Sequence, residues 1–264
     1  MLWGAAGSLQ PHCSCLRQCL PFVFPRVRRF SPFSLSWFSD KVFLSLLSIP
    51  QLNDLLSFGQ HRVWKRMAVS WSGANRGDFV LDLCCGSGDL AFLLSEKVGS
   101  SGKVVGLDFS SEQLAIASSR QNLRAKPCYK NIEWVEGDAL ELPFADGVFD
   151  AITMGYGLRN VFDRQRAMRE MYRVLKPDSR ISILDFNKSH QPVTAFIQEW
   201  MINNVVVPAA AVYGLASDYE YLKSSINGYL TGEELETLAL QAGFSSAKHY
   251  EVSGGLMGNL VAMR

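Results

Sequence analysis

The chain contains 264 residues, of which 48% are hydrophobic and 19% charged, and its formal net charge is +1. This length and composition suit one α/β domain with a full hydrophobic core and exclude a largely disordered chain. The near-zero net charge does not indicate a nucleic-acid partner, and we expect none. No window reaches the roughly 20 apolar residues that span a bilayer, because polar side chains and Pro208 interrupt the most apolar stretch, 193–216.

The first 39 residues differ in charge from the rest of the chain. They contain four arginines but no lysine, aspartate or glutamate, whereas residues 40–264 carry 22 basic and 25 acidic side chains. An acid-free start that contains arginine and serine is typical of organelle transit peptides. We therefore predict a disordered transit peptide over 1–39 and one folded domain over 40–264. A tail without function is the alternative for the first segment.

The folded part alternates short β-rich runs with amphipathic helical stretches. The runs predict strands at 79–84, 103–108, 132–136, 149–154 and 180–186. Helices are predicted at 90–97, after Ser110 as N-cap, at 164–175 and at 234–241, and the end of the chain predicts a hairpin of 246–252 with 256–263. This order predicts an α/β fold, with a Rossmann-like, doubly wound sheet and a C-terminal antiparallel hairpin. Ligands of such sheets bind beyond the carboxyl ends of the strands.

The loop after the first predicted strand fits two classes of cofactor. Residues 86–91 match the G-x-G-x-x-A pattern of dinucleotide sites, and Asp108 lies where such sites place a ribose-binding acid. Asp82, Asp89 and Asp138 add carboxylates that would repel a pyrophosphate and attract an ammonium and a sulfonium. The charge pattern therefore favours S-adenosylmethionine, with a nicotinamide or flavin dinucleotide as the alternative.

This interpretation gives the loop residues separate roles. Gly86 and Gly88 let the backbone approach the methionine part of the cofactor, and Ser87 adds a hydroxyl and an N–H group. Asp108, at the end of its strand, can accept hydrogen bonds from both ribose hydroxyls. We expect all of these residues to bind the cofactor, together with Asp82.

The end of a neighbouring strand supplies the expected contacts with adenine. Asp138 can accept a hydrogen bond from the adenine amino group, while the N–H of Ala139 faces a ring nitrogen. Asp89 fits a helix cap as well as a ligand. Cys84 and Cys85 are interpreted as small apolar fillers, and no spacing of cysteine or histidine indicates a metal site.

Four segments resemble one family of enzymes. They are residues 53–65 (NDLLSFGQHRVWK), 80–89 (VLDLCCGSGD), 155–161 (GYGLRNV) and 171–177 (MYRVLKP). Together they are similar to the ubiquinone/menaquinone biosynthesis C-methyltransferase family, and the likeness extends over residues 52–264. The glycine loop alone is a common motif, whereas segments 53–65 and 155–161 are specific to the family.

The resemblance implies a class I S-adenosylmethionine-dependent methyltransferase that methylates a ring carbon of a prenylated quinol. Residues 67–73 and 228–235 are most similar to the plant plastid members, which methylate demethylphylloquinone in vitamin K1 synthesis. A prenylated naphthoquinol substrate and a chloroplast location are therefore implied, with the mitochondrial ubiquinone member as the alternative. The implied cofactor contacts are Ser87, Asp108, Asp138, Ala139 and Gly155.

Two pairs of residues depart from the family pattern. Members usually carry Tyr-Asp, in a stretch that helps to close the active site, where this chain has Ile49 and Pro50. A cofactor-binding scaffold is thus a non-enzymatic alternative, although the intact segment 155–161 favours an enzyme. Asp178 and Ser179 replace a common glycine pair, and we expect only a changed turn. A small-molecule O-methyltransferase is the enzymatic rival, but no His or Lys base is evident for it.

Methylation of a ring carbon requires the electron-rich, reduced quinol and needs no metal ion. Arg159 can stabilise the phenolate and Asn160 can hold a water that accepts the hydroxyl proton, with helix capping as the alternative for both. His61 has a suitable pKa for a base but fits a solvated side chain better. An insert at about 190–228, with an apolar segment at 196–208, is expected to cover the prenyl tail and contact the membrane, with core packing as the alternative.

Overall fold

A computed structural model describes residues 57, 59–124, 126–188, 196, 199, 200, 204 and 216–264, with only the backbone described for 216–220. The predicted transit peptide, the Ile49-Pro50 difference and most of the predicted insert lie outside these residues.

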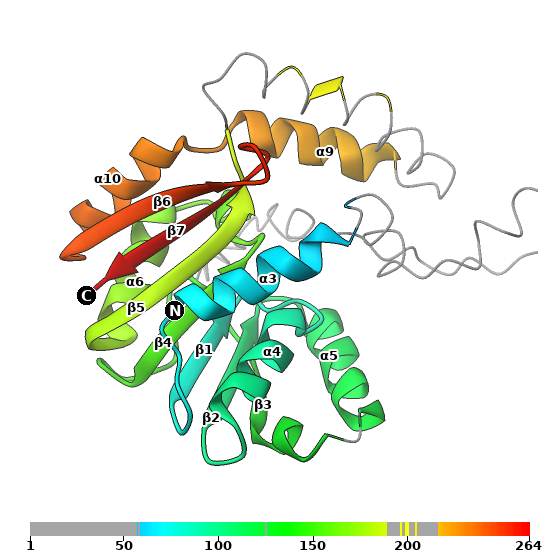
Figure 1. The fold of residues 1–264 in the computed structure, drawn as a ribbon, viewed down its shortest axis with the longest axis vertical. Helices are drawn as coiled ribbons and strands as arrows, with labels where there is room; N and C mark the ends of the chain where they lie inside the picture. Colours follow the sequence, from blue (N-terminus) through cyan, green and yellow to red (C-terminus); the bar gives the residue numbers. More distant parts are fainter. Residues whose placement is uncertain are drawn as a thin grey trace, which may run out of the picture.

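One mixed seven-stranded sheet forms the centre of the domain (Figure 1). Its strands are β1 (Phe79–Leu83), β2 (Lys103–Asp108), β3 (Ile132–Glu136), β4 (Phe149–Gly155), β5 (Leu175–Phe186), β6 (Ser246–Val252) and β7 (Met257–Met263). Their order is β3-β2-β1-β4-β5-β7-β6, in which the first five strands are parallel and β7 runs antiparallel to both of its neighbours. The predicted doubly wound sheet and C-terminal hairpin are confirmed.

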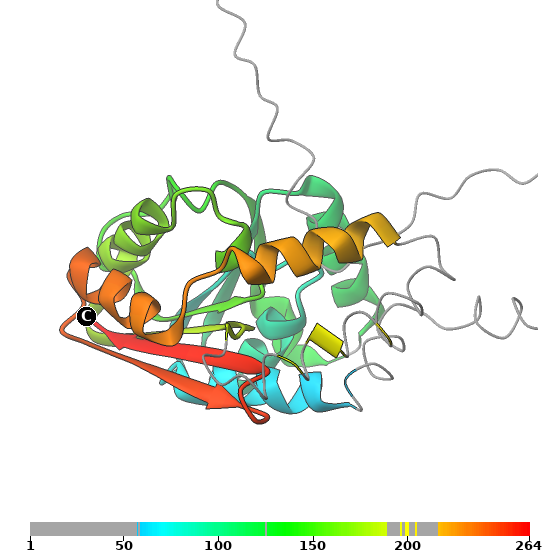
Figure 2. The same ribbon diagram turned by 90° about the horizontal axis from the view of Figure 1, so that it is seen from above.

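Helices cover both faces of this sheet. They are α3 (Gln60–Trp71), α4 (Asp89–Val98), α5 (Ser111–Leu123), α6 (Arg164–Val174), α9 (Ala216–Asn227) and α10 (Gly232–Ala242), with short 3-10 helices η1 (Pro127–Asn131) and η2 (Leu158–Asn160). Alternate strand residues bury opposite faces, because successive side chains in a strand point to opposite sides. Leu81 and Ile152 pack in the layer that contains α6 and α10, whereas Val80 and Ala151 pack in the layer that contains α3 and α4. Figure 2 shows α3 in cyan on one side of the sheet and α6 in light green on the other.

Local sequence signals set several element ends. The Ser110 hydroxyl accepts a hydrogen bond from the Gln113 N–H at 3.2 Å, as the predicted N-cap requires. Thr231 and Glu234 form a reciprocal capping box, so α10 begins two residues before the predicted helix. Helix α6 ends at Val174, shortly before Pro177. A proline disfavours helical backbone in the residue before it, here Lys176, so the helix cannot continue through this segment.

Strand β5 begins earlier than the predicted strand at 180–186. Leu175, expected as the last helical residue, instead pairs with Phe149 of β4, and the register then shifts before Ala151 pairs with Arg180. Asp178 lies in this irregular part with a φ of +62°, in the left-handed region that glycine adopts more readily. The turn at Asp178 therefore has a higher conformational free energy than the same turn would have with glycine.

Two helices border the carboxyl ends of the parallel strands. The indole Nε1 of Trp64, on α3, donates a hydrogen bond of 2.8 Å to Ser253 in the β6–β7 turn. On α9, the Tyr221 hydroxyl donates to Asn160 Oδ1 at 3.1 Å, which ties α9 to η2. Figure 1 shows α9 across the end of the sheet at which β5 finishes. In the part of the chain that the structure describes, no helix is long and apolar enough to cross a membrane.

Candidate cofactor and acceptor site

The candidate site lies at the carboxyl ends of the five parallel strands, β1 to β5. In the strand order, β2 lies on one side of β1 and β4 on the other, so the connections leave β1 and β4 toward opposite faces. Such a switch point opens a crevice for ligands beyond the strand ends. Nine of the ten predicted site residues fall within or beside the loops at this edge, and the tenth, Asp82, lies inside β1.

The glycine loop after β1 has a backbone that other residues adopt poorly. Gly86 has a φ of +52° and Gly88 a φ of +86°. A Cβ atom on Gly88 would come within 2.6 Å of the Trp134 ring, so this position excludes side chains for steric reasons as well. The N–H of Gly86 donates to Asp108 Oδ2 at 2.7 Å, which joins the loop to the end of β2. The loop thus has a conformation that favours glycine, and a hydrogen bond holds it against the end of β2.

Asp108 is buried at the end of β2, with 9% of its surface exposed. Burial raises the pKa of its carboxyl, although backbone N–H groups from Ser110, Gly86 and Phe109 counteract this effect. The Ser110 N–H donates to Oδ1 at 2.9 Å. Each carboxylate oxygen has a second lone pair, so Asp108 can still accept hydrogen bonds from two ribose hydroxyls. Phe109, which sequence reasoning missed, exposes 48% of its surface directly beside this acid.

Asp82 is fully buried within β1. Its Oδ1 accepts a hydrogen bond from the Thr153 hydroxyl at 2.8 Å, whereas Oδ2 has no partner of normal geometry among the described residues. Burial raises its pKa to about 7, even though Thr153 and the nearby Ala91 N–H act in the opposite direction. A buried, unpartnered carboxylate oxygen at this strand end fits a positively charged ligand such as the ammonium of S-adenosylmethionine.

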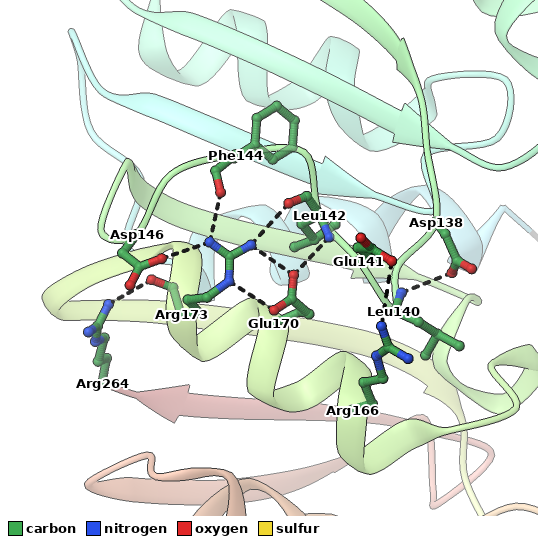
Figure 3. A network of polar contacts seen from close by, with 10 residues as sticks. All are labelled: Asp138, Leu140, Glu141, Leu142, Phe144, Asp146, Arg166, Glu170, Arg173 and Arg264. Carbon is green, nitrogen blue, oxygen red and sulfur yellow. Dashed lines mark hydrogen bonds and ion pairs between the residues drawn. The ribbon is translucent and has the colours of Figure 1, made fainter.

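The loop that follows β3 presents Asp138 to solvent and is anchored from below (Figure 3). Asp138 Oδ1 accepts a hydrogen bond from the Leu140 N–H at 2.9 Å. Further along, the Leu142 N–H donates to Glu170 on α6 at 2.8 Å, and Arg173 donates to the Leu142 carbonyl at 3.0 Å. Arg173 and Glu170 are themselves ion-paired at 2.8 Å. This network fixes the loop that carries the predicted adenine contacts.

Ala139 and Gly155 complete the set of predicted cofactor contacts. Ala139 is buried, with 7% exposure, and its side chain belongs to the core. A Cβ on Gly155 would lie 2.7 Å from Leu90 on α4, so the end of β4 passes close to that helix. The next residue, Tyr156, has a φ of +60°, and its N–H donates to the Leu184 carbonyl at 2.7 Å. The chain thus turns sharply where β4 meets the expected acceptor.

The predicted catalytic residues Arg159 and Asn160 lie together in η2. Arg159 is buried and forms an ion pair of 2.8 Å with Asp185 at the end of β5. Its Nη1 also donates to the Tyr156 carbonyl at 2.7 Å, while its buried Nε has no partner among the described residues. Asn160 is held at both ends, because its Nδ2 donates to the same carbonyl at 3.3 Å and its Oδ1 accepts from Tyr221. Neither Asp185 nor Tyr221 was singled out from the sequence.

Asp89 does not contribute a free negative charge to the site. It accepts hydrogen bonds of 2.6 Å from Lys65 and from Arg120. Burial alone would raise its pKa, but the two cations outweigh this effect and hold the pKa far below its usual range. The charge argument that counted Asp89 among free carboxylates was wrong on this point, because its partners lie 24 and 31 residues away and leave no local signal.

Three other residues considered from the sequence, Cys85, Cys84 and His61, lie in surroundings that fit a structural role. Cys85 is buried, and burial raises the pKa of its thiol well above the ordinary value. Cys84 has a φ of +54° in the glycine loop. His61 makes a hydrogen bond of 2.9 Å between its Nδ1 and the Ser57 hydroxyl. Within the described ranges, no group of three or more His, Cys, Asp or Glu side chains is arranged to hold a metal ion.

Comparison with known proteins finds relatives that match about four-fifths of the chain. A chloroplastic 2-phytyl-1,4-beta-naphthoquinone methyltransferase of Arabidopsis thaliana is 79% identical over 213 residues, covering 81% of this chain and 82% of that protein. A 2-phytyl-1,4-naphthoquinone methyltransferase of Synechococcus elongatus is 52% identical, covering 80% and 89%.

Solved structures identify the fold of this chain, and a family comparison identifies its family. The crystal structure of a SAM-dependent methyltransferase from Aquifex aeolicus covers 85% of this chain and 98% of its own, with a TM-score of 0.57 and 21% identity, which shows a shared fold. Residues 39–264 match the ubiE/COQ5 methyltransferase family. The fold is therefore that of class I S-adenosylmethionine-dependent methyltransferases, and the chain belongs to the ubiE/COQ5 methyltransferase family.

Proposed function

We propose that this chain transfers a methyl group from S-adenosylmethionine to a ring carbon of demethylphylloquinol, the reduced form of 2-phytyl-1,4-naphthoquinone. The product is phylloquinol, the quinol of vitamin K1. The observation that carries the proposal is the 79% identity with the Arabidopsis enzyme named for this naphthoquinone. The chloroplastic name of that relative and the acid-free first 39 residues support a chloroplast location.

The cofactor-binding residues follow from the site. Asp82 would hold the ammonium, and Asp108 the ribose hydroxyls. Gly86, Ser87 and Gly88 would contact the methionine part. Asp138 and the Ala139 N–H would contact adenine, with the exposed Phe109 ring against its face. Gly155 would border the transferred methyl group.

The acceptor must be electron-rich at the carbon that is methylated. When bound, S-adenosylmethionine supplies an electrophilic methyl group. Loss of a quinol hydroxyl proton gives a phenolate, and its neighbouring ring carbon forms the new C–C bond as the S–C bond breaks. The methylated ring carbon then loses its proton and the ring oxygen regains one, which restores the aromatic quinol. S-adenosylhomocysteine, the methylated quinol and one net proton remain. Positioning of the two substrates and exclusion of water account for much of the rate.

Residues of this chain would stabilise the negative charge of the phenolate and direct the transfer of the hydroxyl proton. Arg159 cannot act as a base, because its guanidinium stays protonated, but it can stabilise the phenolate through its unpartnered Nε. Asp185 would hold that guanidinium in place through their 2.8 Å ion pair. Asn160, with its orientation set by Tyr221, would hold the water that accepts the hydroxyl proton.

The predicted insert would cover the phytyl tail and contact the membrane in which the quinone resides. Two of its described side chains are apolar and exposed, Phe196 at 69% and Trp200 at 52%. Replacing Trp200 by Glu should raise the KM for the quinol and leave S-adenosylmethionine binding intact. Equal weakening of both would contradict this role, and the exposed Tyr250 on β6, changed to Phe, serves as the control.

The decisive experiment supplies the purified protein with S-adenosylmethionine and chemically reduced demethylphylloquinone, and detects one added methyl group by mass spectrometry. Product that disappears when the quinone is left oxidised would support the quinol mechanism. Demethylated ubiquinone precursors, offered in parallel, test the mitochondrial alternative. Cofactor binding without any product would instead favour the scaffold alternative that the Ile49-Pro50 difference raises.

A further inference from the structure

Three charged side chains from three helices meet beside the glycine loop. Asp89, the first residue of α4, accepts a hydrogen bond of 2.6 Å from Lys65 of α3 and another of 2.6 Å from Arg120 of α5. Arg120 turns its second amino group to Ser87, and donates to the carbonyl at 2.5 Å and to the hydroxyl at 2.7 Å. One guanidinium therefore makes three hydrogen bonds to residues 87–89. We call Lys65, Asp89 and Arg120 the loop clamp.

The loop clamp differs from an ordinary surface ion pair. The side chains of Lys65 and Arg120 are only 14% and 24% exposed, while that of Asp89 is 42% exposed. Exposed pairs contribute little, because solvent and salt screen them. Here the planar fork of Arg120 reaches a carboxylate, a hydroxyl and a backbone carbonyl at once, a geometry that a lysine ammonium cannot reproduce. The ring of Phe92 lies 5.5 Å below the guanidinium and limits its movement.

Charge shows that the loop clamp does not attract the cofactor directly. It contains two cations and one carboxylate, so it offers no net attraction for a sulfonium or an ammonium. Its contacts instead fix backbone. The loop has left-handed residues at Gly86 and Gly88, and glycine is the residue that loses most conformational freedom when it is ordered. When the loop is already held in its binding conformation, binding of the ligand does not have to supply the free energy that orders the loop.

We propose that Arg120 is a positioning residue for S-adenosylmethionine, and that it acts with Lys65 through Asp89 to hold the glycine loop in its binding conformation. This inference rests on the proposed cofactor. Lys65 also joins the loop to α3. Trp64 of the same helix is hydrogen-bonded to the β6–β7 turn. The loop is therefore supported by α3, a helix that precedes the alternating strands and helices of the sheet.

The test compares Arg120→Lys, which keeps the charge but loses the fork, with Arg120→Met. Binding of S-adenosylmethionine to the full chain is measured by calorimetry without quinol, together with the Tm. We expect both Arg120 variants to raise the Kd about tenfold or more, since charge-assisted hydrogen bonds are lost, while the Tm falls by only a few degrees. Lys103→Met is the matched control, because Lys103 and Glu133 form a 2.7 Å pair that is more than half exposed.

Each outcome decides a separate question. An unchanged Kd in Arg120→Lys, with or without a lower Tm, overturns the positioning role. If the Arg120 variants do not fold, Lys65→Met decides in the same way, with a raised Kd expected and an unchanged Kd refuting the proposal. A Ser87→Ala background should reduce the effect of Arg120→Lys on the Kd, because one of the contacts is already absent. Failure of the unaltered chain to bind S-adenosylmethionine would overturn the proposed function instead.

Discussion

Asp82 is the residue whose replacement separates stability from cofactor binding most sharply. It is fully buried, and burial raises its pKa from 3.8 to about 7. Between these values the folded protein holds a proton that the unfolded chain does not. The cofactor-free protein should therefore become more stable as pH falls from about 7 to about 4, and the buried carboxylate costs about 4 kcal/mol above that range.

Replacing Asp82 by Asn removes this cost while keeping the side-chain shape. The amide oxygen can still accept the hydrogen bond from Thr153, although the amide nitrogen would face the Ala91 N–H and recover less than the full amount. At pH 8 we expect the variant without cofactor to be more stable than the unaltered protein by a few kcal/mol, up to about 4. The same change should abolish measurable S-adenosylmethionine binding, because the charge that faces the ammonium is lost.

Two measurements check this reasoning. Urea unfolding of both proteins at pH 5, 6, 7 and 8 should give curves that converge at low pH and diverge at high pH. Calorimetry at pH 7 in two buffers of different ionisation enthalpy should show proton release when the unaltered protein binds S-adenosylmethionine, because a nearby cation lowers the pKa of Asp82. Identical pH dependence in the two proteins, or full cofactor affinity in Asp82→Asn, would refute the assignment.

Three further substitutions test other parts of the site. Gly88→Ala should destabilise the protein by roughly 2 kcal/mol or more, since it combines a φ of +86° with a Cβ 2.6 Å from Trp134. Urea unfolding that shows no loss of stability would contradict this steric argument. Tyr221→Phe should lower kcat about tenfold and leave the Kd for S-adenosylmethionine unchanged, because it releases the Asn160 amide. Steady-state kinetics with an unaltered kcat would exclude this link. Asp178→Gly should stabilise by about 1 kcal/mol by relieving a φ of +62°, measured as a Tm higher by about 2–4 °C, and a lower Tm would show that Asp178 makes a compensating contact.

Local patterns in the sequence determined most of the fold. The strands at 103–108 and 132–136 have the predicted ends, and the N-cap at Ser110 forms as expected. Such features depend on side chains a few residues apart, whose periodicity and capping chemistry are visible in a short window. The glycine loop and Asp108 could likewise be placed, because the parallel order of strands brings their carboxyl ends to one edge.

Tertiary structure alone decided which charges are free at that edge. Asp89 and Asp82 lie seven residues apart with the same charge, yet one is neutralised by Lys65 and Arg120 while the other keeps an unpartnered oxygen. The partners of Asp89 come from other helices, and no sequence spacing encodes such a meeting. The pairing of Arg159 with Asp185, 26 residues away, has the same origin. Folding sets the burial and the neighbours of a charged group, and these determine whether it anchors the structure or remains available to a ligand.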